Sequence, residues 1–197
     1  MEPELIVQLE RLGEAVCREV LPRAAVRRFA IGPCGEFVGA AFTPRGDDVR
    51  ALLAPCREAE LIAVTLGVQS ERMLLREQAR DAGQALLLDA VLSAATEAAC
   101  DALERCLRAQ LSGQGRYLTE RFSPGYGDMP LEQSREICAV LGTDTAIGLT
   151  VSDSGILIPR KSVTAVLGVG DAPPARRHSA CESCAACGTC AMRREKQ

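Results

Sequence analysis

One loop guides the interpretation of the whole sequence, and it reads Arg121-Phe122-Ser123-Pro124-Gly125-Tyr126-Gly127-Asp128-Met129-Pro130. Its Pro-Gly pair forces a sharp turn, and its two glycines let backbone amides approach a ligand without intervening Cβ atoms. Arg121 offers a planar guanidinium suited to a carboxylate or a phosphate, and Tyr126 offers a flat face and a hydroxyl. From these residues alone, the loop is either a cradle for a small molecule or an ordinary tight turn with an exposed arginine and a packed tyrosine.

Extended segments and one helix are predicted around this loop. Residues 117–122 alternate in polarity, which predicts a strand leading into it. Residues 131–141 follow with helical spacing, and Pro130 suits the start of a helix. Residues 147–151 and 162–167 are rich in strand formers, and a turn is predicted at 153–155.

A long helical region precedes the loop. Residues 70–110 are rich in Ala, Leu, Glu and Arg, and Gly83 is expected to divide them into helices at about 70–82 and 84–111. The second helix carries three acidic residues within an otherwise apolar, small-residue surface: Asp89, Glu97 and Asp101. Carboxylates in such a setting require partners.

The first third of the chain mixes both kinds of element. Apolar residues at helical spacing predict a helix over residues 5–20, closed by Pro22. Residues 37–42 and 61–65 are predicted as strands, and a helix is expected to start at 46–48. The uneven mixture predicts an α+β fold with a mostly antiparallel sheet and flanking helices.

Composition excludes several functional classes. The chain is 47% hydrophobic and 25% charged with a net charge of −3, which is typical of a globular protein and leaves no basic stripe for nucleic acid. No apolar run reaches the roughly 18 residues of a membrane span. The acidic start of the chain is unlike a signal peptide, so we expect a cytoplasmic protein.

The order of the motifs resembles a known family. Arg-x-x-x-Gly-Tyr at 121–126, then a helix, then a Gly-Leu-Thr strand, is similar to the activation domain of cobalamin-dependent methionine synthase. Pro159-Arg160-Lys161-Ser162-Val163 resembles that family's Pro-x-x-Ser-Val segment. The likeness is strongest over 117–168, and the loop is most similar to the stand-alone form of the domain.

The resemblance implies a binding site for S-adenosylmethionine. By analogy with the family, Arg121 would pair with the methionyl carboxylate, the backbone of Ser123 and Gly125 would contact the ligand, and Tyr126 would lie near the corrin. A glutamate on the preceding long helix also contacts the ligand in the family, and Glu97 is its best match here. The alternative is that Glu97 is a structural residue satisfied by a neighbouring arginine or backbone group.

The resemblance also implies an accessory role in reactivation. The cobalamin would be supplied by the cobalamin-binding module of methionine synthase or by another corrinoid protein, and the electron by a donor such as flavodoxin or ferredoxin. Such a protein holds a methyl group in line with cobalt, which is an orientation role that needs no catalytic acid or base. No catalytic residue is therefore assigned, and nucleic acid and membrane are not expected as partners.

One departure from the family concerns the end of the module. Fused members continue past the Ser-Val strand into another aromatic-bearing strand that helps close the site, whereas here a Gly- and Pro-rich stretch follows. We therefore expect a module over 1–168, a linker and cysteine-rich tail over 169–197, and a more open ligand pocket.

The tail contains four cysteines at regular spacing: Cys181, Cys184, Cys187 and Cys190. Thiols three residues apart wrap one metal centre, and this spacing suits an iron–sulfur cluster or tetrahedral zinc. A metal-free or redox-active thiol tail fits the same residues. Two other functions therefore stand beside reactivation: a metal-binding redox protein with a purely structural loop, and an interaction module that binds a corrinoid protein but no methyl donor.

Overall fold

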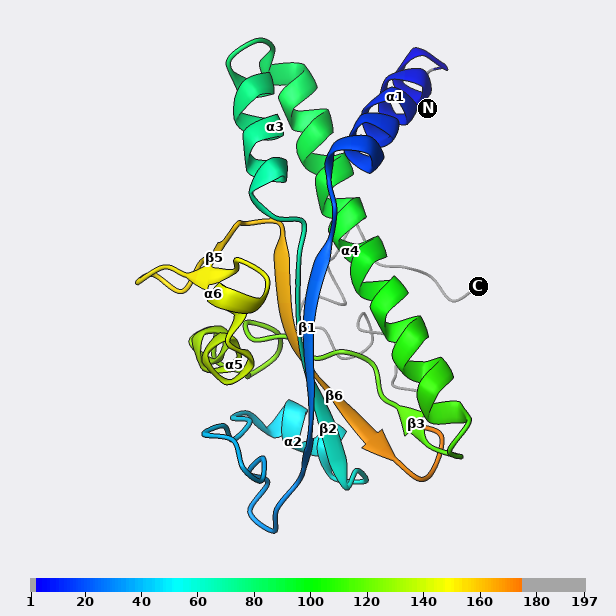
Figure 1. Cartoon of the computed structure of the whole chain (residues 1–197), viewed down its shortest axis with the longest axis vertical. Coiled ribbons are helices and arrows are strands. Elements are labelled where there is room, and N and C mark those ends of the chain that lie inside the picture. Colours follow the sequence, from blue (N-terminus) through cyan, green and yellow to red (C-terminus); the bar gives the residue numbers. More distant parts are fainter. Residues whose placement is uncertain (1–2, 175–197) are drawn as a thin grey trace, which may run out of the picture.

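The protein is built around a four-stranded antiparallel sheet, and the computed structural model describes residues 3–174 (Figure 1). The strand order is β1 (Arg23–Ala30), β2 (Glu58–Thr65), β6 (Ser162–Gly170) and β3 (Tyr117–Leu118). Every neighbouring pair in this sheet is antiparallel. The predicted α+β class with a mostly antiparallel sheet and flanking helices is confirmed.

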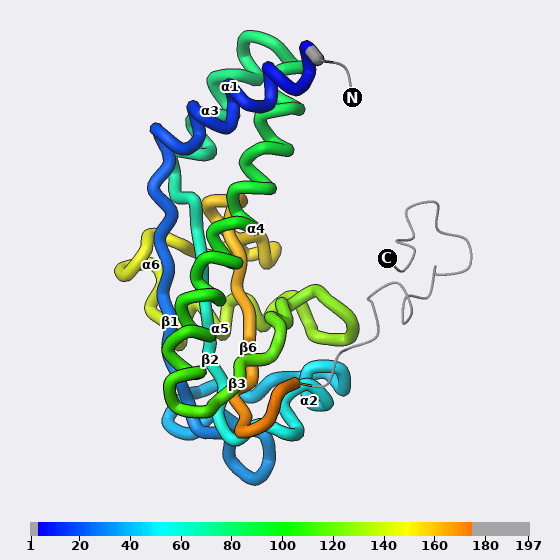
Figure 2. The backbone as a smooth tube through the Cα atoms, turned by 90° about the vertical axis from the view of Figure 1, so that its right-hand side faces the viewer, coloured from blue at the N-terminus to red at the C-terminus, as the bar shows by residue number. Residues whose placement is uncertain are grey.

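Helices cover both faces of the sheet. Successive strand residues point to opposite faces, and Ile62 of β2 packs with Leu107 and Leu111 of α4 (Ala82–Ser112). Leu61 faces the other way, toward α2 (Asp47–Leu53) and α5 (Gln133–Leu141). In Figure 2, the second half of α4 runs along the sheet. The sheet is therefore the middle layer of a three-layer domain.

A helical arm extends beyond the end of the sheet (Figure 1). It consists of α1 (Pro3–Glu19), α3 (Val68–Gln78) and the first half of α4. Its own core includes Val16, Leu74 and Leu92, all of which are buried. The arm thus holds the first half of α4, while the second half packs on the sheet.

A small hairpin completes the fold near α5. It follows α6 (Thr143–Ala146) and consists of β4 (Thr150–Val151) and β5 (Leu157–Ile158), with the predicted turn at 153–155 between them. Strand was predicted over 147–151, but only the last two of those residues are extended, because Ile147 and Leu149 fill a core pocket beside Cys138.

Two predictions in the first third of the chain failed. Strand β1 was not predicted, because its arginines leave only Phe29 buried at this sheet edge. Residues 37–42 were predicted as a strand, which is wrong: they form a turn in which the Phe37 amide donates to the Phe42 carbonyl at 3.0 Å. The apolar run arises because Phe37 and Phe42 fill the core, where their ring centroids lie 5.2 Å apart in an edge-to-face arrangement.

Three boundaries also differ from expectation. The break between α3 and α4 lies at residues 79–81, where the Asp81 side chain caps α4 and Gly83 is its second residue. The predicted strand over 117–122 shortens to β3 and an isolated bridge between Phe122 and Val166. Helix α5 begins at Gln133, two residues later than predicted.

The start of the predicted linker is strand. Strand β6 continues beyond Gly168 to Val169 and Gly170, and Gly170 pairs with Tyr117 of β3. Gly168 lacks a side chain because the Cys56 sulfur lies 2.5 Å from where its Cβ would be. This glycine marks close packing within a sheet and not a flexible connection. Among residues 3–174, no helix is both long and apolar enough to cross a membrane.

Candidate functional site

Arg121 lies where the chain leaves the sheet and enters the loop. On one side, Thr119 exchanges hydrogen bonds with Gly168: its amide donates to the Gly168 carbonyl at 2.9 Å, and its hydroxyl accepts from the Gly168 amide at 2.8 Å. On the other side, Phe122 and Val166 exchange two backbone hydrogen bonds of 2.9 Å. The backbone of Arg121 is thus fixed on β6 from both directions.

The side chain of Arg121 reaches three carboxylates on α4. It donates to Asp101 at 2.9 Å and also to Glu97 and Glu104. These acids are spaced four and three residues apart, so they share one face of the helix. We call this set, with Arg121, the α4 acid cluster. The sequence suggested Glu97 as a partner in the site, and the fold brings it directly against Arg121.

The members of the α4 acid cluster differ in exposure. The side chains of Glu97 and Asp101 are 61% and 55% exposed, whereas that of Glu104 is only 11% exposed. Arg121 itself is 23% exposed. The cluster therefore has a buried end at Glu104 and an open end that solvent, or a ligand, reaches.

Electrostatics keep the guanidinium charged. Burial disfavours the charged form of Arg121, but the hydrogen bonds that Arg121 donates to Asp101, Glu104 and Glu97 outweigh this effect and raise its pKa. The neighbouring Cys100 is fully buried, and desolvation raises the pKa of its thiol to about 11 even though Arg121 acts in the opposite direction. Cys100 is thus a neutral thiol at pH 7 and is a packing residue beside the cluster.

The loop beyond Arg121 is compact and partly accessible. Gly125 adopts a φ of +88°, and its amide donates to the Met129 carbonyl at 2.9 Å. The Ser123 carbonyl accepts from the Tyr126 amide at 3.1 Å. The Tyr126 side chain is 71% exposed. The predicted sharp turn is present. The Gly125 amide already donates to Met129, so Gly125 would let a ligand approach its backbone closely but would not donate a hydrogen bond to it.

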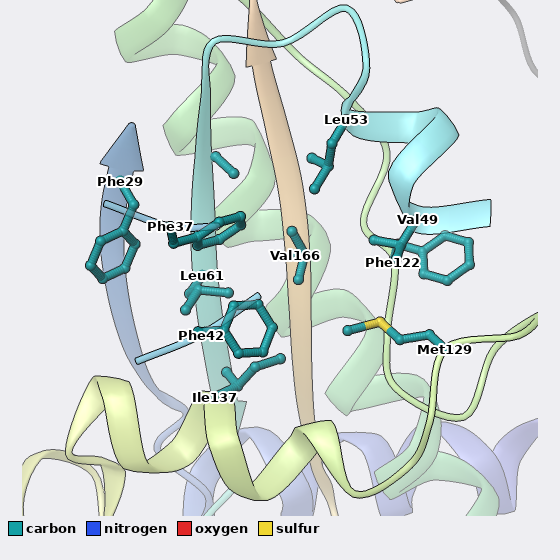
Figure 3. Packing of buried hydrophobic residues seen from close by; sticks show 11 residues of the cluster. Phe29, Phe37, Phe42, Val49, Leu53, Leu61, Phe122, Met129, Ile137 and Val166 are labelled. Atoms are coloured by element: carbon teal, nitrogen blue, oxygen red, sulfur yellow. The ribbon is translucent and has the colours of Figure 1, made fainter. Parts of the chain in front are cut away.

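The loop is anchored on the core and on α2. Phe122 and Met129 point into the same apolar cluster as Val49 and Ile137 (Figure 3). The Asp128 carboxylate accepts from the amides of Asp47 and Asp48 at 2.5 and 3.2 Å, which caps α2 from outside the helix. These backbone hydrogen bonds, led by that from Asp47, lower the pKa of Asp128. The loop is therefore held in a defined shape.

Sequence reasoning missed several of these residues. Glu104 and Arg108 were not singled out, although Glu104 lies seven residues after Glu97 and three after Asp101, on the same helical face. Asp128 was quoted only as part of the loop, because no pattern indicates that it caps a helix 80 residues earlier. Asp89 has a separate partner in Lys161 at 2.8 Å and does not belong to the cluster.

The predicted metal ligands lie outside the described residues. Cys181, Cys184, Cys187 and Cys190 all follow residue 174. Over the range 3–174, no group of three or more His, Cys, Asp or Glu side chains is arranged to hold a metal ion. The cysteine motif therefore stays a prediction.

The fold resembles a solved protein. A crystal structure of the MetH reactivation domain bound to AdoHcy (S-adenosylhomocysteine) aligns with a TM-score of 0.61 and 15% sequence identity, covering 87% of this chain and 68% of that chain. No protein-family model matches the sequence, and neither does any curated protein. The resemblance drawn from the sequence is thus confirmed for the fold. The comparison does not test the site, whose description depends on the contacts given above.

Proposed function

We propose that this protein binds S-adenosylmethionine between α4 and the 121–130 loop and supports reductive methylation of cob(II)alamin on a separate corrinoid protein. One observation carries the proposal: Glu97 and Arg121, both expected from the sequence as ligand contacts, meet through a direct hydrogen bond. The fold that brings them together is similar to that of the MetH reactivation domain, which was solved bound to AdoHcy.

The donor set fits the charges of the ligand. The methionyl end of S-adenosylmethionine carries a carboxylate and an ammonium, and a positive sulfonium lies nearby. Arg121 suits the carboxylate as a two-pronged donor, and the exposed carboxylates of Glu97 and Asp101 suit the cations. Without ligand these groups pair with one another, so binding exchanges internal ion pairs for pairs with the ligand.

The loop geometry favours presenting the ligand toward a partner. When bound, the ligand supplies the methyl group, and an external donor such as flavodoxin or ferredoxin supplies one electron. The protein's task is orientation, because its residues need only hold the sulfonium methyl in line with the partner's cobalt. Tyr126 protrudes from the loop and is the residue we propose to face the corrin. Ser123 would contact the ligand through its backbone.

Calorimetry tests the binding step. Titration with S-adenosylmethionine should show saturable binding to the wild type, and Arg121→Ala should weaken it by about ten- to a hundredfold, because a charge-assisted two-pronged hydrogen bond is lost. Arg28→Ala is the matched control, since Arg28 also pairs with a buried glutamate but lies on the outer strand of the sheet. No binding to the wild type at millimolar ligand would refute the proposal.

A reconstitution assay tests the second step. Adding the protein to an inactive cobalamin-dependent methionine synthase, with S-adenosylmethionine and an electron donor, should restore turnover. Binding without recovery would favour the alternative of a different corrinoid partner. The metal-binding redox alternative makes a different prediction, namely stoichiometric iron or zinc in anaerobically purified protein that depends on the tail cysteines. No contact among residues 3–174 favours that alternative over reactivation.

A further inference from the structure

Glu104 differs from the other acids of the α4 acid cluster because it serves two arginines at once. One carboxylate oxygen accepts from Arg121, and the other accepts from Arg108 at 3.3 Å. Its side chain is only 11% exposed, so few water molecules compete for it. A carboxylate that is buried and shared in this way is strongly constrained, unlike Glu97 and Asp101.

Arg108 ties this carboxylate to the chain leading into the loop. Its guanidinium donates to the carbonyl of Thr119 at 2.8 Å and to that of Leu118, the last residue of β3. Glu104 therefore lies between one arginine that clasps the backbone at 118–119 and another, Arg121, that belongs to the same segment. The helix and the start of the loop are joined at this point.

Backbone contacts leave only the side chain of Arg121 to be fixed. Its neighbours Thr119 and Phe122 are both hydrogen-bonded to β6. An arginine side chain has several rotatable bonds, and holding a guanidinium in one orientation removes an entropic cost that ligand binding would otherwise carry. The contact with Glu104 is the buried contact able to provide that hold.

We infer that Glu104 is a positioning residue for the ligand site: it anchors the guanidinium of Arg121 from the buried side, so that the opposite side is presented to the carboxylate of the ligand. This inference rests on the proposed function. Glu97 and Asp101 are the exchangeable partners, because they are exposed and a ligand is able to replace them. Glu104 is retained as a partner in both states.

The test compares two ligands that differ by one carboxylate. Glu104→Gln should weaken binding of S-adenosylmethionine about tenfold and change that of decarboxylated S-adenosylmethionine less than about twofold, because only the first ligand uses Arg121. In an Arg121→Ala background, Glu104→Gln should have no further effect on S-adenosylmethionine. Glu60→Gln, which alters a buried acid paired with Arg28, should leave both affinities unchanged.

Two results would overturn the inference: equal losses for both ligands, or an effect of Glu104→Gln that persists without Arg121. A ligand-free measurement separates this inference from the proposed function. In nitrogen-15 NMR, the guanidinium of Arg121, assigned by its loss in Arg121→Lys, should show separate, slowly rotating Nη signals that average in Glu104→Gln. If the wild type binds no S-adenosylmethionine, the proposed function fails, and unchanged Nη signals in Glu104→Gln would still refute the positioning role.

Discussion

Helix α4 makes two sets of ion pairs with segments far away in the sequence, and they are built differently. Near its first half, Lys161 meets one acid, Asp89, at 2.8 Å, and it also donates to the Ser93 hydroxyl at 2.8 Å. Farther along, Arg121 meets three acids, two of them more than half exposed. In this first set, the one basic side chain pairs with one acidic side chain, and no carboxylate is in excess.

The second set has more acceptor capacity than the fold requires. Glu104 and Arg108 already secure the segment at 118–121, so Glu97 and Asp101 add little to holding the chain. Exposed ion pairs of this kind contribute about 0–1 kcal/mol each to stability. The exposed carboxylates beside a fixed guanidinium therefore exceed what stability requires, and the proposed ligand site rests on this surplus.

The largest expected effect follows from removing the central cation. Arg121→Met should lower the free energy of unfolding by about 2 kcal/mol, between the costs of breaking an exposed and a buried ion pair, because three acids are left facing one another. Lys161→Met should cost only about 1 kcal/mol, since Asp89 is partly exposed and remains hydrated. Urea denaturation of both variants measures the difference.

A second variant tests why Arg121→Met should lose stability. Adding Glu104→Gln to Arg121→Met should recover part of the stability, because the buried carboxylate causes much of the damage. A double variant that is less stable than Arg121→Met would contradict this account of the cluster.

The next effect should separate binding from stability. Glu97→Gln combined with Asp101→Asn should weaken S-adenosylmethionine binding about tenfold while changing the free energy of unfolding by no more than about 1 kcal/mol. Asp89→Asn should give the opposite pattern, with unchanged affinity and a measurable loss of thermal stability. Calorimetry and thermal melts on the same samples test both, and equal affinity losses in the two variants would remove the distinction between the sets.

The smallest effect concerns pH and the cap that Asp128 provides. Because hydrogen bonds lower the pKa of Asp128 in the folded protein, its ionised form stabilises the fold above the unfolded-state pKa of about 4, and this contribution is lost as pH falls through the lower folded value. The stability difference between wild type and Asp128→Asn should therefore be largest near neutral pH and disappear once the pH has fallen below the lowered pKa of Asp128. Asp144→Asn, an exposed acid on α6, is the control. A constant difference at all pH values would contradict the cap.

The sequence determined the fold class, and it supplied a hypothesis for the site. Periodicity and composition predicted the helices α1 to α5 and the core of β2, because each has a clear apolar pattern of its own. The family resemblance proposed Glu97, Arg121 and the Gly-Tyr pair as ligand contacts, and the fold does bring Glu97 against Arg121. Local pattern sufficed wherever an element buries one continuous face.

Only the tertiary structure decided the rest, because those features depend on partners that are distant in sequence. Strand β1 is extended because β2 pairs with all eight of its residues, although its own sequence is mostly polar or small. Residues 37–42 form a turn whose aromatic rings fill the core, and Gly168 continues β6 because it pairs with Ala59 of β2. Cys56 packs where a side chain of residue 168 would lie. The roles of Glu104, Arg108 and Asp128 exist only once α4, the loop and α2 have come together.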